Sequence, residues 1–111
     1  MTFLYLNSDQ IGTGPEELGR KLLALFLDKL VHSEIRVDAV ACLNRAVFLT
    51  TSEGPALESF KVLAARGALI TTCGTCLEFY GRKDQLLVGA VGGMQQTVEM
   101  FASAHRVIAP C

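Results

Sequence analysis

Short apolar runs alternate with amphipathic stretches along the chain, and this alternation is the feature that most limits the possible folds. The runs have the length and the largely continuous apolar character of strands buried on both faces of a sheet. They cover residues 3–6, 37–43, 68–72, 86–91 and 106–109. Strand and helix in alternation imply crossover connections, which make neighbouring strands parallel. The sequence therefore predicts one α/β domain over residues 1–111, a three-layer sandwich of about five parallel strands with helices on both faces.

The amphipathic stretches predict the helices of this sandwich. Leu18, Leu22 and Leu25 recur at three- and four-residue spacing within a first helix that begins at Glu16. Similar periodicity predicts a second helix over 57–64 and a third over 94–102. Residues 46–49 are four apolar residues that fit either a strand or a helical turn.

Composition excludes several classes of protein. The chain has 111 residues and a formal net charge of −1, which gives no reason to expect binding to nucleic acid or to an anionic membrane. No run approaches the ~20 apolar residues of a membrane span, and no secretory signal opens the sequence. We therefore expect a cytoplasmic protein with reduced thiols. Half of the residues are hydrophobic, which predicts doubly covered strands, a homo-oligomer interface, or both.

The motif Cys73-Gly74-Thr75-Cys76 follows the third predicted strand, where a helix is expected to begin. A thiol at a helix start meets unpaired backbone N–H groups, which favour the thiolate, and the second thiol lies one turn further along. Gly74 allows the turn, and the Thr75 hydroxyl is a candidate cap. This arrangement suits nucleophilic sulfur chemistry. The alternatives are two structural thiols in a binding subunit and a dithiol redox switch.

Other candidate residues fall at the same carboxyl edge of the predicted sheet, where the functional loops of such folds lie. The candidates for binding at this edge are Asn7, Ser8, Asp9, Gly12, Asn44 and Met94. The loop 7–14 is glycine-rich, but it lacks the Lys-Ser/Thr of a P-loop and the three-glycine dinucleotide fingerprint. We expect no cofactor and no metal. Cys42 lies in an apolar run and is expected in the core, whereas the terminal Cys111 has no predicted role.

These stretches together resemble the DsrE/DsrF-like sulfur-relay family, and within it the carboxyl-terminal domain of YedF-type selenium-metabolism proteins. The most distinctive match is the run Cys73–Leu77 with Phe79 and Gly81. Supporting matches are 7–9 with Gly12 and Gly14, Asn44 with 46–49, and Val88-Gly89 leading to Met94. Ala46 and Gly93 depart from the residues that are usual in that pattern.

The resemblance implies a flavodoxin-like sandwich in which 46–49 form a helical turn. It implies that Cys73 carries sulfur or selenium as a persulfide or perselenide, and that Cys76 is the partner thiol. The implied partners are donor and acceptor proteins, and members of the family commonly form oligomers. YedF-type proteins carry a TusA-like domain with a Cys-Pro motif, which is absent here. We therefore expect either a separate TusA-like carrier or a different acceptor.

Overall fold

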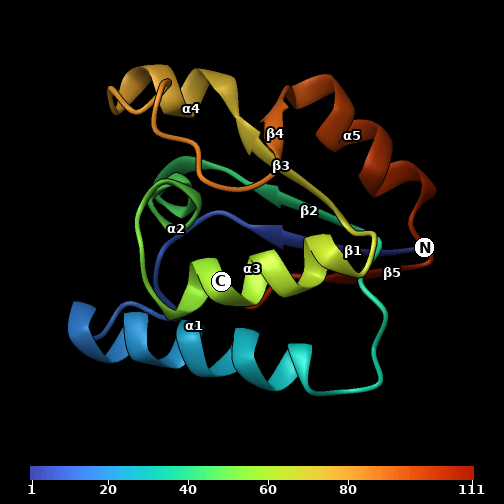
Figure 1. The fold of residues 1–111 in the computed structure, drawn as a ribbon, viewed down its shortest axis with the longest axis horizontal. Coiled ribbons are helices and arrows are strands. Elements are labelled where there is room, and N and C mark those ends of the chain that lie inside the picture. The colour runs from blue at the N-terminus through green and yellow to red at the C-terminus, as the bar shows by residue number, and fades with distance from the viewer.

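In the computed structural model, which describes all 111 residues, five strands form one parallel sheet (Figure 1). The strands lie in the order β4-β3-β2-β1-β5, so the chain steps outward from β1 to β4 and then returns to β5 on the other side of β1. Their bounds are β1 Thr2–Leu6, β2 Ala39–Cys42, β3 Leu69–Cys73, β4 Ala90–Gly92 and β5 Arg106–Ile108. All four strand pairings are parallel, which confirms the predicted fold class.

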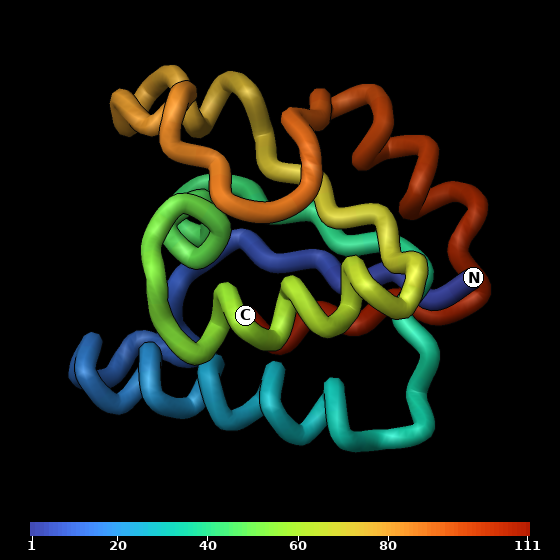
Figure 2. The backbone as a smooth tube through the Cα atoms, in the orientation of Figure 1, coloured from blue at the N-terminus to red at the C-terminus, as the bar shows by residue number.

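Helices cover both faces of the sheet, as Figure 1 shows: α1 and α3 lie on one face, and α4 and α5 on the other. The helices are α1 Glu16–Val31, α2 Val47–Thr51, α3 Pro55–Ala65, α4 Gly74–Phe79 and α5 Met94–Ser103. A short 3-10 turn, η1 (Asn44–Ala46), leads into α2, so the helical alternative for residues 46–49 is confirmed. In the tube of Figure 2, α2 is seen nearly end-on beside the carboxyl ends of the central strands. No helix combines the length and the apolar character that crossing a bilayer requires.

Alternate residues of each strand contribute to two separate cores, because successive side chains of a strand point to opposite faces. Leu4 and Leu6 of β1 join the larger core beneath α1 and α3, together with Phe60. Phe3 joins the smaller core on the opposite face, together with Met100 of α5. The two covered faces explain why the central strand β2, which is buried at every position, is apolar at every position instead of at every second one.

The fourth strand is shorter than the sequence predicts. The apolar run 86–91 predicts a strand along its whole length, but only its end enters β4. Gly89 has φ +72°, and a Cβ at this position would lie 2.2 Å from the carbonyl oxygen of Ile70. The N–H of Leu87 donates instead to the carbonyl of Thr50 in α2. The prediction was wrong here because a turn at Gly89 lets the preceding loop bond to α2.

Candidate functional site

The two neighbouring strands β2 and β3 lead the chain to opposite faces of the sheet. β2 continues through η1 and α2 to α3 on one face, whereas β3 continues directly into α4 on the other (Figure 1). Such a divergence between adjacent parallel strands leaves a crevice at their carboxyl ends, which is where ligands bind in open α/β sheets. Cys73 closes β3 and Cys76 lies in the first turn of α4, so the topology brings both thiols to this crevice.

A backbone N–H group that follows β2 donates a hydrogen bond to Cys76 across the crevice. The N–H of Asn44, the first residue of η1, donates to Cys76 Sγ at 3.1 Å. The Cys73 thiol lies near enough to Cys76 to influence its pKa. Both cysteines are half-buried against the smaller core, and neither is in a disulfide. The contact between Cys73 and Cys76 is the one that the spacing of the motif predicts.

The surroundings of Cys76 act on its pKa in opposite directions. Burial raises this pKa above its ordinary value, and the neighbouring Cys73 raises it further. The N–H of Asn44 lowers the same pKa, because it favours a negatively charged sulfur, but it does not overcome the other two effects. Cys76 is therefore a protonated thiol at neutral pH, with a donor already placed for its anionic form.

Asn44 is held in an uncommon backbone conformation. Its φ is +54°, in the left-handed region, where asparagine is tolerated better than most residues other than glycine. The Tyr80 hydroxyl donates to Asn44 Oδ1 at 3.1 Å, and the Tyr80 ring packs against Phe48 with 4.8 Å between ring centroids. These contacts fix the direction of the Asn44 N–H toward Cys76.

A cavity of about 460 Å³, here called the thiol cavity, opens beside Cys76. It brings together three of the predicted binding residues, Asn7, Asn44 and Thr75. Cys76 lines this cavity, whereas Cys73 lies beside Cys76 without lining it. The remaining walls are largely aromatic and apolar and were not predicted as site residues: Tyr5, Leu43, Phe79 and Tyr80. The adjacent pair 79–80 is visible in the sequence directly after the cysteine motif, and Tyr5 is the polar-tipped residue of an otherwise apolar run.

The residues 8, 9 and 12 of the first loop do not reach the thiol cavity. The buried carboxylate of Asp9 turns to the other side of η1, where Arg45 Nε lies 3.1 Å away and Arg20 Nε lies 3.5 Å away. The Ser8 hydroxyl accepts the N–H of Gln10, and Gly12 forms a turn with φ +80°. The sequence places this loop at the correct edge of the sheet, but β1 directs most of it away from the thiols.

Two further predicted residues frame the site without lining the cavity. Gly74 begins α4, where a Cβ would lie only 3.0 Å from Val91 Cγ1 of the neighbouring strand. Met94 begins α5 and has a side chain that is 58% exposed. A side chain at position 74 would therefore press against β4, whereas Met94 faces outward.

The other two cysteines lie apart from the motif. Cys42 is completely buried in the larger core, on the opposite face of the sheet, as predicted. Cys111 is half-buried against the same core, with its Sγ 3.8 Å from the carbonyl oxygen of Ser8. No group of three or more His, Cys, Asp or Glu side chains converges in a way that could hold a metal ion.

The family profile described as DsrE/DsrF-like matches residues 9–110, nearly the whole chain. The chain belongs to the DsrE/DsrF-like family. This membership confirms the resemblance seen in the cysteine motif and the loop edge, and it relates the protein to those of sulfur relays. No curated protein sequence matches the chain.

Solved structures share the fold at low sequence identity. The ychN protein from E. coli is 14% identical, with a TM-score of 0.65 over 97% of both chains. MTH1491 from Methanobacterium thermoautotrophicum, a protein of unknown function, is 19% identical, with a TM-score of 0.70 over 98% of this chain and 97% of that one. BT1422 from Bacteroides thetaiotaomicron is 14% identical, with a TM-score of 0.67 over 97% and 93%. At these identities the likeness establishes the DsrE-like sandwich and nothing finer.

Proposed function

We propose that this member of the DsrE/DsrF-like family is a sulfur- or selenium-relay protein that carries the chalcogen on Cys73. The observation that carries the proposal is the pair of neighbouring, half-buried thiols at the β2/β3 crevice, with Cys76 open to the thiol cavity and hydrogen-bonded by the Asn44 N–H. A carrier site needs an accessible sulfur, a second thiol within reach, and a donor for negative charge. These three features meet at this one edge of the sheet.

The loading step is a thiolate exchange. The Cys73 thiolate attacks the outer sulfur of a donor persulfide, the sulfur–sulfur bond of the donor breaks, and the donor leaves as a thiolate. The product is a persulfide on Cys73, whose terminal sulfur carries the negative charge. When the donor carries a perselenide, the same exchange transfers its selenium atom to Cys73 and the donor again leaves as a thiolate.

The second thiol offers two ways to release the cargo. An acceptor thiolate that attacks the terminal sulfur of the persulfide takes it over and regenerates Cys73. Alternatively, the Cys76 thiol gives its proton to the terminal sulfur of the persulfide, and the resulting thiolate attacks Cys73 Sγ. This step forms the Cys73–Cys76 disulfide and expels hydrosulfide, and a thiol reductant then restores both cysteines. The Asn44 N–H stabilises negative charge on the sulfur of Cys76 in the second route.

The proposed partners are a donor and an acceptor protein, such as a TusA-like carrier, with the chain itself in a homo-oligomer. Apolar side chains near the thiols support protein–protein contact: Phe79, a wall of the thiol cavity, is 82% exposed. Met94, Val98 and Phe101 form an exposed apolar stripe along α5. We place the protein in the cytoplasm, because the relay needs the thiols of Cys73 and Cys76 in their reduced form.

Intact-mass measurement after incubation with a persulfide donor tests the relay. We expect an adduct of one sulfur atom on the wild-type chain, its loss in Cys73→Ser, and its retention in Cys76→Ser. Cys111→Ser is the matched control, because it removes a half-buried thiol far from the motif in the sequence. An adduct that is lost only in Cys76→Ser moves the carrier role to Cys76.

The same experiment separates the two rival functions. A dithiol switch is favoured by the contact between Cys73 and Cys76, and it predicts a loss of two hydrogen masses on oxidation without any sulfur adduct. A binding subunit with structural thiols predicts neither change. Absence of a sulfur adduct on the wild-type protein rejects the relay.

A further inference from the structure

A second and larger cavity lies on the other side of η1 from the thiols. Its volume is about 660 Å³, within the range of small-molecule sites in proteins. It is bounded by the first half of α1, by η1 and α2, and by the segment that leads into α3. Asn44 lines the thiol cavity and the next residue, Arg45, lines this one, so η1 is a wall shared by both. We call it the arginine cavity.

The lining of the arginine cavity carries an excess of positive charge. Four cationic residues contribute to it, against two acidic ones, Asp9 and Glu53. Arg45 and Arg20 both contact the buried carboxylate of Asp9, so these three groups largely satisfy one another. The two other cations, Lys21 and Arg82, have no carboxylate within ion-pair distance.

Arg82 is held in place without an anionic partner. Its Nη1 donates to the Ser52 hydroxyl at 3.0 Å and to the Thr51 hydroxyl at 3.2 Å. The guanidinium carbon lies 4.6 Å from the centre of the Phe48 ring, a favourable cation–π contact. The Nε and Nη2 groups make no hydrogen bond within the protein, so they are available as donors to a planar anion such as a carboxylate or a phosphate.

The same cavity offers an apolar surface next to these charges. Phe48 and Leu49 of α2, Ala24 of α1 and Leu57 of α3 contribute to the lining. A site that joins apolar walls to a few fixed donors selects ligands with an apolar body and one charged group. A bare inorganic ion would leave most of this volume unused.

We propose that the arginine cavity binds a small organic anion whose carboxylate or phosphate group is held by Arg82 and Lys21, with its apolar body against Phe48. The site is separate from the thiols and does not depend on the relay. Arg45, which lines this cavity, is next in sequence to Asn44, whose backbone N–H donates to Cys76 Sγ.

Titration with phenyl phosphate, followed by amide chemical shifts, tests the proposal. We expect saturable binding with shifts grouped around α2 and the start of α3. Lys21→Gln and Arg82→Gln should each weaken the affinity by about tenfold, which corresponds to the loss of one charged hydrogen bond. Lys21 is exposed and makes no hydrogen bond or ion pair, so its replacement tests the charge without disturbing the fold.

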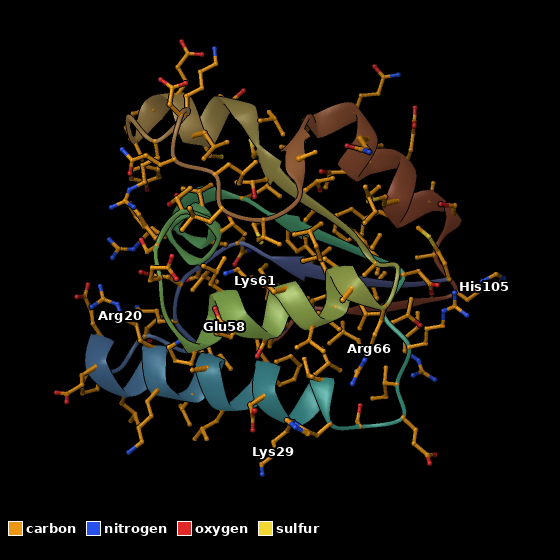
Figure 3. All side chains as sticks on the ribbon, viewed as in Figure 1. Arg20, Lys29, Glu58, Lys61, Arg66 and His105 are labelled. Carbon is orange, nitrogen blue, oxygen red and sulfur yellow. The ribbon has the colours of Figure 1, made fainter.

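Arg66→Gln is the matched control. Figure 3 shows Arg66 at the end of α3 away from Arg20, and its guanidinium donates to the carbonyl of Val31 outside the arginine cavity. Its replacement should leave the affinity unchanged, as should Cys73→Ser, whose effect is confined to the relay. Thermal melting checks that Arg82→Gln folds, and if it does not, Lys21→Gln alone decides.

Three comparison probes define the ligand class. Benzoate separates carboxylate from phosphate recognition, inorganic phosphate lacks the apolar body, and benzyl alcohol lacks the charge. Inorganic phosphate and benzyl alcohol should both bind at least about tenfold more weakly than phenyl phosphate. The proposal is overturned if phenyl phosphate does not bind saturably, or if a folded Lys21→Gln or Arg82→Gln variant keeps full affinity. It is also overturned if inorganic phosphate or benzyl alcohol binds as tightly as phenyl phosphate.

Discussion

The backbone N–H of Asn44 donates to Cys76 Sγ across 3.1 Å and so joins the end of β2 to the helix that follows β3. The two residues are 32 positions apart in the chain. They meet because β2 and β3 are neighbours in the sheet and lead to opposite faces. This hydrogen bond supports the proposed sulfur-handling site at this edge.

Removal of Cys73 should make Cys76 more reactive at neutral pH. Burial is the largest cause of the raised pKa of Cys76, and the neighbouring Cys73 raises it further. In Cys73→Ala the second cause is absent, so the pKa of Cys76 falls and a larger fraction of Cys76 is thiolate at any pH below that pKa. The check is the rate of iodoacetamide alkylation at Cys76 between pH 7 and 9, followed by fragment-ion mass spectrometry. An unchanged or slower rate in the variant would contradict the arrangement of the two thiols.

The buried thiol of Cys42 should weaken the fold at alkaline pH. Burial raises its pKa far above the ordinary value near 9, with a smaller contribution from Cys111. The folded state therefore keeps this thiol neutral, while the unfolded chain ionises it above that ordinary value. Stability that depends on the neutral thiol is complete below pH 9 and is lost as the pH rises further, by about 1.4 kcal/mol per pH unit.

Urea unfolding at several pH values between 8 and 11 measures this loss. Tyrosine and lysine side chains also titrate in this range, so the comparison is with Cys42→Ala, which keeps every one of those groups. The free energy of unfolding should fall less steeply with pH in the variant. Equal slopes for the two proteins would show that Cys42 is not protected from solvent.

Gly89→Ala should destabilise the protein strongly. The φ of Gly89 is +72°, and the added Cβ would lie 2.2 Å from the carbonyl oxygen of Ile70, so the clash involves backbone that cannot give way easily. We expect a loss on the order of 3 kcal/mol or more in the free energy of unfolding. Gly93→Ala is the control, because position 93 has a negative φ and no atom within 4 Å of the new Cβ. If the two variants have the same melting temperature, the turn at Gly89 is not as tight as the structure has it.

A charge in the apolar stripe of α5 should dissociate the proposed homo-oligomer. Val98 lies at the centre of this stripe and is 58% exposed. Val98→Glu would place a carboxylate in the interface between two copies, where desolvation opposes it. Light scattering should show an oligomer for the wild type and a monomer for the variant, while Gln95→Glu adds the same charge to the exposed polar side of α5 and should leave the oligomer intact. A monomeric wild type would reject the oligomer.

Local patterns were sufficient to predict most of the elements and their succession along the chain. The three-layer sandwich, the long helix from Glu16 and the helical turn at 46–49 all depend on periodicity, capping residues and resemblance within short stretches. The placement of Cys73 and Cys76 at a strand-to-helix junction is equally local. Burial of Cys42 also followed from its apolar neighbours, because a run that is apolar at every position is covered on both faces.

The side-chain contacts at the site and the length of the fourth strand depended instead on contacts between distant parts of the chain. Asp9 was expected at the same site as the thiols, yet Arg45 and Arg20 hold its carboxylate on the other side of η1. Only residues 90 and 91 of the predicted strand 86–91 enter β4, because the Ile70 carbonyl lies against Gly89 and the Thr50 carbonyl accepts the N–H of Leu87.

The set of residues at the carboxyl edge of the sheet was therefore already present in the amino-acid sequence, whereas the tertiary structure divided that set between two cavities. Asn7, Asn44 and Thr75 line the thiol cavity with Cys76, whereas Asp9 lines the arginine cavity. The physical reason is that secondary structure reports hydrogen bonds and side-chain periodicity over a few residues. The order of the strands and the face to which each one leads are decided by packing of the whole sheet.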